Sequence, residues 1–221
     1  MSRSTQARRP AAPPRRRVPL VAILLGVVAV LLVGAIAVNA LTKDDDAGSG
    51  GEVAQVRAVT VEGTPLERFT EDGAGDPAIG TAAPQIDGAD FEGNAQSLGG
   101  QTGTPTLALF VAHWCPHCQA EVPRVVDWRA DGTIPDDIDL VAVSTGVAPE
   151  RGNYPPSSWL AEEGWPGRVL VDDASNQAAG YYGLPSYPYF VALDADGNVV
   201  ARARGELDQE AVAAIVDQLR S

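Results

Sequence analysis

The chain's only two cysteines, Cys115 and Cys118, are separated by two residues and stand where an apolar run gives way to a helical pattern. Two thiols at this spacing can form a disulfide with each other with little backbone movement, so the pair can take up and release two electrons. A disulfide across so short a loop restricts the unfolded chain only slightly. The pair therefore indicates redox chemistry rather than a stabilising crosslink.

Apolar runs and helical patterns alternate in the second half of the chain. Two nearly unbroken apolar runs, 106–112 and 139–144, are typical of strands buried on both faces. The remaining elements that we expect are a weak edge strand in 53–61, a hairpin over 91–98, strands at 169–171, 189–193 and 199–203, a helix after Cys118 that contains Pro123, a serine-capped helix at 157–163, a helical stretch at 174–181, and a last helix capped by Asp208. This order predicts an α/β fold with a mixed sheet in three layers.

Charge divides the chain sharply. The first 17 residues contain six arginines and no acid, whereas all 29 acidic residues lie after Lys43. Residues 18–41, between these blocks, carry no charge, and about 20 apolar residues suffice to span a bilayer. We therefore predict a single-pass anchor in the cell membrane. The arginines before it place the N-terminus in the cytoplasm and the rest of the chain outside.

The predicted organisation is a basic cytoplasmic tail at 1–17, a transmembrane anchor at 18–41, a linker at 42–78 and a compact domain at 79–221. A cleavable signal peptide is the alternative, because Ala35, Ala37 and Ala40 offer small residues to a peptidase. We favour the anchor because the run exceeds the usual length of about 7 to 15 residues in a signal peptide. Either route leads to a compartment that permits disulfides, and the acidic composition argues against nucleic acid as a partner.

Two stretches carry a family resemblance. Residues 109–123, which contain Trp114-Cys115-Pro116-His117-Cys118, resemble the strand, active-site turn and kinked first helix of the thioredoxin superfamily. Residues 182–194, which contain Tyr187 and Pro188, are similar to the matching block of the TlpA- and ResA-like membrane-anchored thioredoxins. The resemblance covers about residues 79–221. It implies a thioredoxin-like three-layer sandwich preceded by a transmembrane helix.

The resemblance also suggests roles for single residues. Cys115 precedes the start of the helix, whose partial positive charge favours a thiolate, so Cys115 is the expected nucleophile and Cys118 the resolving thiol. The Tyr187–Pro188 bond is expected to be cis and to offer a backbone edge to the substrate chain. Pro116, His117 and Trp114 are expected to support the cysteines, with Trp114 as a lid. The redox-active disulfide needs no cofactor, and we predict no metal.

The direction of electron flow is less constrained. The Cys-Pro-His-Cys motif resembles DsbA-type oxidases, but the surrounding sequence resembles reductases that serve cytochrome c assembly or metallochaperones. Leu109 occupies the position at which many thioredoxins carry a buried carboxylate, so a base would have to be water, a histidine or Glu121, and we expect Glu121 on an exposed helix face. With His117 as a donor beside Cys115 and no buried carboxylate, we predict an oxidising or isomerising potential.

The predicted function is an extracytoplasmic thiol–disulfide oxidoreductase that exchanges disulfides with protein substrates and with a membrane redox partner. A TlpA- or ResA-like reductase for the cysteines of cytochrome c or metallochaperones is one alternative. The other is a non-catalytic metal-holding module, because His113, Cys115, His117 and Cys118 supply four potential ligands within six residues.

Overall fold

The computed structural model describes residues 53–70 and 75–221. The predicted tail, the predicted anchor and part of the predicted linker lie outside these ranges, so they stay predictions. Within them, no helix combines the length and the apolar character that a membrane crossing requires.

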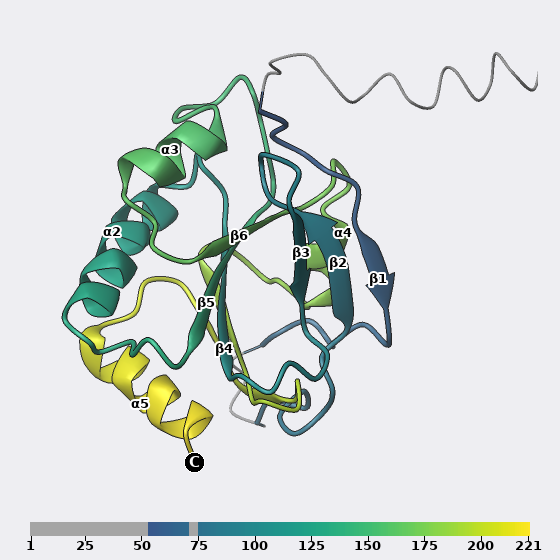
Figure 1. The fold of residues 1–221 in the computed structure, drawn as a ribbon, viewed down its shortest axis with the longest axis vertical. Coiled ribbons are helices and arrows are strands. Elements are labelled where there is room, and N and C mark those ends of the chain that lie inside the picture. Colours follow the sequence, from purple (N-terminus) through teal and green to yellow (C-terminus); the bar gives the residue numbers. More distant parts are fainter. Residues whose placement is uncertain (1–52, 71–74) are drawn as a thin grey trace, which may run out of the picture. The chain divides into compact units, whose positions relative to one another are not determined.

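The strands of the described residues form one mixed sheet in the order β1-β2-β6-β5-β4-β7-β8, with β3 paired to β2 (Figure 1). β4 is central: it runs parallel to β5 and antiparallel to β7. β5 in turn runs parallel to β6, and β7 antiparallel to β8. In chain order the strands are β1 (Thr60–Glu62), β2 (Gln85–Ala89), β3 (Ala95–Leu98), β4 (Thr106–Val111), β5 (Asp139–Ser144), β6 (Arg168–Val171), β7 (Tyr189–Leu193) and β8 (Val199–Arg204).

Helices cover both faces of the sheet, which gives three layers. One face carries α2 (Pro116–Ala130), α3 (Pro156–Glu162) and α5 (Gln209–Leu219), and the other carries the short α4 (Gln177–Tyr181) (Figure 1). Each face has its own hydrophobic cluster. The first includes Val122 and Val125 of α2, and the second includes Tyr182 just after α4. The predicted three-layer α/β architecture is confirmed.

The two long apolar runs are strands, as predicted, and they form the centre of the sheet. All six residues of β4 are buried, as are five of the six residues of β5. A central strand covered on both faces has no exposed side, so its sequence needs no polar alternation. This pair of rigid strands positions the cysteines, because β4 leads directly into the turn that carries them.

Several expected details differ. The hairpin pairs β2 with β3, so its first strand lies before residue 91. α3 begins after Pro155 and has no side-chain cap, in contrast to the predicted serine. Asp208 does cap α5, where it accepts a hydrogen bond from the Ala211 N–H. β1 is shorter than the predicted edge strand, but Leu66 and Phe69 after it are buried. The packed unit therefore extends N-terminally of residue 79.

Candidate functional site

The two cysteines lie at the first turn of α2, directly after the central strand. Cys115 is the N-cap residue with extended backbone, and Pro116 follows at a position where a missing N–H costs nothing. Both cysteines are free thiols; Cys115 is 6% exposed and Cys118 is fully buried. Of the two residues, only Cys115 therefore keeps any exposed surface.

The Tyr187–Pro188 peptide bond is cis, as predicted, and Tyr187 lies beside the Cys115 thiol. The Cys115 thiol lies 3.8 Å from the carbonyl oxygen of Tyr187, to which it donates. The next carbonyl, that of Pro188, accepts the Gly205 N–H at 2.8 Å, which anchors this segment to the end of β8. The structure therefore brings together the predicted nucleophile and the predicted substrate-binding edge.

Glu121 lies one helical turn after Cys118, and its side chain is fully buried. The expectation of an exposed helix position was wrong. Residues three apart lie on the same face of a helix, so Glu121 occupies the buried face that also carries Cys118 and Val125. This spacing was the sequence signal for its burial. A carboxylate therefore does lie beneath the redox pair, although Leu109 replaces the usual one.

Burial is the main influence on both groups. It raises the pKa of the Cys118 thiol well above the usual range, and the neighbouring Cys115 and Glu121 raise it further. Burial also raises the pKa of Glu121, against the opposing effect of two hydrogen bonds. These come from the Leu207 N–H at 3.0 Å and from Arg124 at 3.0 Å. The pKa of each group is thus shifted in the direction of its protonated form, and the two groups influence each other electrostatically.

His117 points to a different partner from the one expected. Its Nδ1 lies 2.7 Å from Glu206, which belongs to the segment between β8 and α5, and the imidazole is 67% exposed. Arg124 donates to the second oxygen of the same carboxylate at 2.7 Å. These two partners lower the pKa of Glu206, with the His117 bond as the larger cause. Sequence reasoning missed Glu206 and Arg124, because neither carries a motif.

Trp114 connects the redox turn to the loop after β5. Its Nε1–H donates to the Gly146 carbonyl at 2.7 Å, and its ring meets the ring of Tyr187 edge-on at 5.9 Å. The Arg151 guanidinium lies 3.6 Å from the centre of the indole. The indole is thus held on three sides. Its role as a lid stays a prediction.

Gly146 is required for this arrangement. Its φ is +62°, and a Cβ there would lie 2.6 Å from the Tyr187 hydroxyl oxygen. Its N–H donates to the Asn176 side chain at 2.8 Å. The Asn176 side-chain oxygen also lies within hydrogen-bonding distance of the Thr145 hydroxyl, which donates to the buried Asp172 at 2.8 Å. This chain of polar contacts fixes the loop against which Trp114 rests.

His113 turns away from the cysteines. Its Nε2 accepts the Ala148 N–H at 3.1 Å, so its Nδ1 carries the proton and donates to the Gly152 carbonyl at 2.8 Å. Both ring nitrogens are therefore occupied by the loop after β5. Among the residues that the structure describes, no cluster of three or more potential metal ligands is found.

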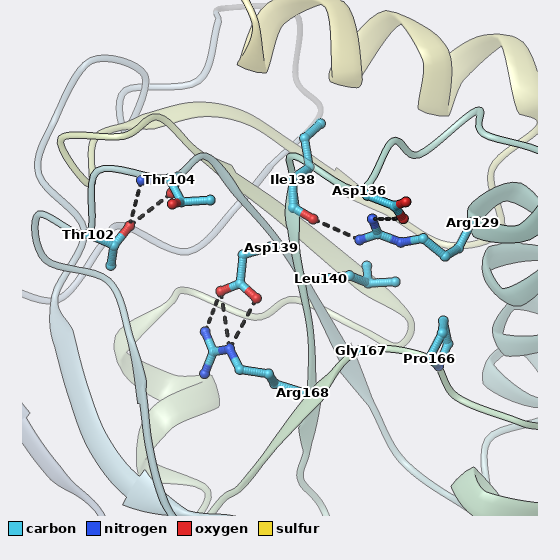
Figure 2. Close-up of a pocket in the computed structure, with 10 residues that line it drawn as sticks. All are labelled: Thr102, Thr104, Arg129, Asp136, Ile138, Asp139, Leu140, Pro166, Gly167 and Arg168. Carbon is cyan, nitrogen blue, oxygen red and sulfur yellow. Dashed lines mark hydrogen bonds and ion pairs between the residues drawn. The ribbon is translucent and has the colours of Figure 1, made fainter.

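A hollow of about 810 Å³ lies at the opposite end of the sheet, where β4 and β5 begin. Its two cationic side chains, those of Arg129 and Arg168, both bind groups of the protein itself (Figure 2). Arg168 pairs with Asp139, and Arg129 donates to the carbonyl of Ile138 and pairs with Asp136. The hollow has no contact with the cysteines, which follow the other end of β4.

Comparisons with curated proteins relate the chain to thiol chemistry. Methylamine utilization protein MauD of Paracoccus denitrificans is 33% identical over 132 residues, which cover 58% of this chain and 59% of MauD. Thiol:disulfide interchange protein HelX of Rhodobacter capsulatus is 26% identical over 117 residues, which cover 53% of this chain and 61% of HelX. The chain thus spans about 60% of the length of these relatives.

Solved structures show the same fold. The thioredoxin domain of a thiol-disulfide oxidoreductase from Bacteroides vulgatus superposes with a TM-score of 0.52 at 22% identity, over 65% of this chain and 99% of that one. A thiol:disulfide interchange protein of the thioredoxin family from Chlorobium tepidum gives 0.50 at 23% identity, over 66% and 100%. The Redoxin family model matches residues 78–219, more than half of the chain. The chain, with its thioredoxin-like fold, therefore belongs to the Redoxin family.

Proposed function

We infer that the protein is a membrane-tethered thiol–disulfide oxidoreductase that acts on protein disulfides outside the cytoplasm. The observation that carries this proposal is the arrangement of the two thiols: Cys115 lies beside the Tyr187 carbonyl and keeps a small exposed area, whereas Cys118, one helical turn later, is fully buried. An accessible nucleophile above a protected second thiol is what two-step exchange requires. The Redoxin family and the names of the relatives support the same reaction class.

The first step uses the accessible thiol. Cys115 loses its proton to solvent, and its thiolate attacks one sulfur of the substrate disulfide. The substrate S–S bond breaks, a mixed disulfide between Cys115 and the substrate forms, and the other substrate sulfur leaves as a thiolate that takes up a proton. A substrate chain beside the Tyr187–Pro188 edge presents its sulfur to Cys115.

The second step uses the buried groups. Cys118 passes its proton to the Glu121 carboxylate and attacks the Cys115 sulfur, so the mixed disulfide breaks and the Cys115–Cys118 disulfide forms. The second substrate sulfur leaves and is protonated. Two electrons have moved from the dithiol to the substrate, and a dithiol partner at the membrane must return them before the next cycle.

The structure alters the two premises of the predicted oxidising potential. The buried carboxylate that was expected to be absent is supplied by Glu121, and His117 bonds Glu206. Without the histidine as a donor, the Cys115 thiolate loses one source of stabilisation, and a less stable reduced form makes the couple more reducing. We therefore assign the reductive direction. His113, with both ring nitrogens engaged, favours this redox role over the metal-holding alternative.

Labelling of intact cells tests both location and activity. Cells that express the full chain are treated with a membrane-impermeant maleimide and then fractionated. We expect labelled protein in the membrane fraction, with the label on Cys115. The membrane preparation should also reduce a model disulfide protein when a dithiol is supplied, whereas the Cys115→Ala variant should not. Labelling only after lysis, or equal activity of the variant, would overturn the proposal.

A further inference from the structure

The segment after β8 contacts the redox helix at two points. Glu206 accepts from Nδ1 of His117 at 2.7 Å, and the next residue, Leu207, donates its N–H to Glu121 at 3.0 Å. Arg124 bridges the two carboxylates, with distances of 2.7 Å to Glu206 and 3.0 Å to Glu121. One short segment thereby touches both the exposed residue between the cysteines and the buried carboxylate behind them.

The His117 bond is more than an incidental surface pair. His117 is the second of the two residues between the cysteines, so its imidazole belongs to the first turn of α2, which follows Cys115 directly. A histidine there can donate to the Cys115 thiolate only if its ring turns toward the sulfur. In this structure the ring nitrogen is instead held by a carboxylate.

Two further features make Glu206 a firm holder of the ring. Its side chain is only 32% exposed, and its second oxygen is fixed by Arg124, which is itself held by the buried Glu121. A carboxylate with one oxygen already bonded has less rotational freedom to lose when it binds the imidazole. The Glu206 carboxylate is therefore already positioned to accept a hydrogen bond from His117, in competition with the Cys115 sulfur.

We propose that Glu206 is a positioning residue of the redox pair, which keeps His117 turned away from the Cys115 sulfur and so makes the couple more reducing. Removal of the carboxylate frees the imidazole to donate to the Cys115 thiolate. The reduced form is then stabilised, and the disulfide becomes the stronger oxidant. This inference rests on the proposed function only in requiring a reversible Cys115–Cys118 couple.

The test is a double-mutant cycle read out as the equilibrium constant with glutathione. The full chain in detergent is compared as wild type, Glu206→Ala, His117→Ala and the double variant. We expect Glu206→Ala to shift the constant about tenfold toward the oxidising side, which corresponds to roughly 30 mV for a two-electron couple. In the His117→Ala background the same substitution should shift it by less than about threefold.

Two controls separate positioning from charge and from folding. Glu210→Ala removes an equal charge from the exposed first turn of α5 and should leave the constant unchanged. Glu206→Gln keeps an acceptor for the imidazole, so its shift should be smaller than that of Glu206→Ala. An equal shift in the presence and absence of His117, an equal shift from Glu210→Ala, or no shift at all would overturn the inference. Absence of any reversible couple in the wild type would instead overturn the proposed function.

Discussion

The indole N–H of Trp114 donates a 2.7 Å hydrogen bond to the carbonyl of Gly146, and this bond ties the redox turn to the loop after β5. The same glycine faces the Tyr187 hydroxyl so closely that no side chain fits between them. One residue with positive φ thus sets the spacing between Trp114, which precedes Cys115, and Tyr187, whose carbonyl accepts from the Cys115 thiol.

Substitution of Gly146 by alanine tests this spacing. We expect Gly146→Ala to lower kcat/KM for a protein disulfide on the order of tenfold, because the new Cβ displaces Tyr187 from Cys115. The strained backbone should also lower the free energy of unfolding by at least about 1 kcal/mol. Gly152→Ala, in the same loop, is the matched control, since its Cβ meets nothing within 4 Å. Equal losses in both variants would contradict the role of Gly146.

The order of reaction of the two thiols can be trapped. Cys118→Ala should accumulate a mixed disulfide with the substrate, because the buried resolving thiol is missing, whereas Cys115→Ala should accumulate none. In the wild type, Cys115 should alkylate on the order of 100-fold faster than Cys118, whose burial raises its pKa and blocks access. Mass spectrometry identifies the modified residue. Predominant trapping by Cys115→Ala would reverse the assignment.

The role of Glu121 as a proton acceptor should be measurable in the resolving step, in which Cys118 attacks the mixed disulfide. We expect Glu121→Gln to slow release of the mixed disulfide on the order of tenfold to 100-fold, because an amide cannot accept the Cys118 proton. The first step, attack by Cys115, should change little. Rapid-mixing kinetics with a fluorescent substrate separates the two steps. Asp127→Asn, on the exposed side of α2, is the control, and an effect of equal size there would contradict the assignment.

The Glu121→Gln variant also tests how the stability of the protein depends on pH. Burial raises the folded pKa of Glu121 above its value in the unfolded chain, so the unfolded state loses this proton first as pH rises. The wild type should therefore lose stability relative to Glu121→Gln from about pH 4.5 upward, until the folded pKa is passed. Each unit of pKa difference is worth about 1.4 kcal/mol. Urea unfolding at several pH values measures the difference in unfolding free energy between the wild type and Glu121→Gln. A difference that does not change with pH would contradict the raised pKa of the buried Glu121.

Much of the fold could be predicted because buried strands and capped helices have recognisable sequence patterns. The runs that became β4 and β5 are apolar throughout, and Asp208 caps α5 through a local contact with Ala211. The cis bond before Pro188 was predicted from resemblance rather than from periodicity. These features depend on neighbours in sequence or on a strongly marked motif.

The surroundings of the cysteines were harder to predict because they depend on contacts between distant segments. Glu206 lies 89 residues from His117, and no local pattern pairs them. Glu121 was expected on the surface because acidic residues are mostly exposed. Its three-residue spacing from Cys118 could have indicated otherwise. For Glu121, the general tendency of acidic residues to be exposed was thus given more weight than the helical spacing that indicated burial.

The equilibrium reduction potential of the Cys115–Cys118 couple in the full chain tests the account most directly. It is measured by titration with glutathione or dithiothreitol buffers, and Trp114, next to Cys115, provides a fluorescence signal. We expect one reversible two-electron transition, with a potential nearer to the roughly −270 mV of thioredoxin than to the roughly −120 mV of DsbA. A potential near −120 mV, or the absence of a reversible transition, would contradict the account.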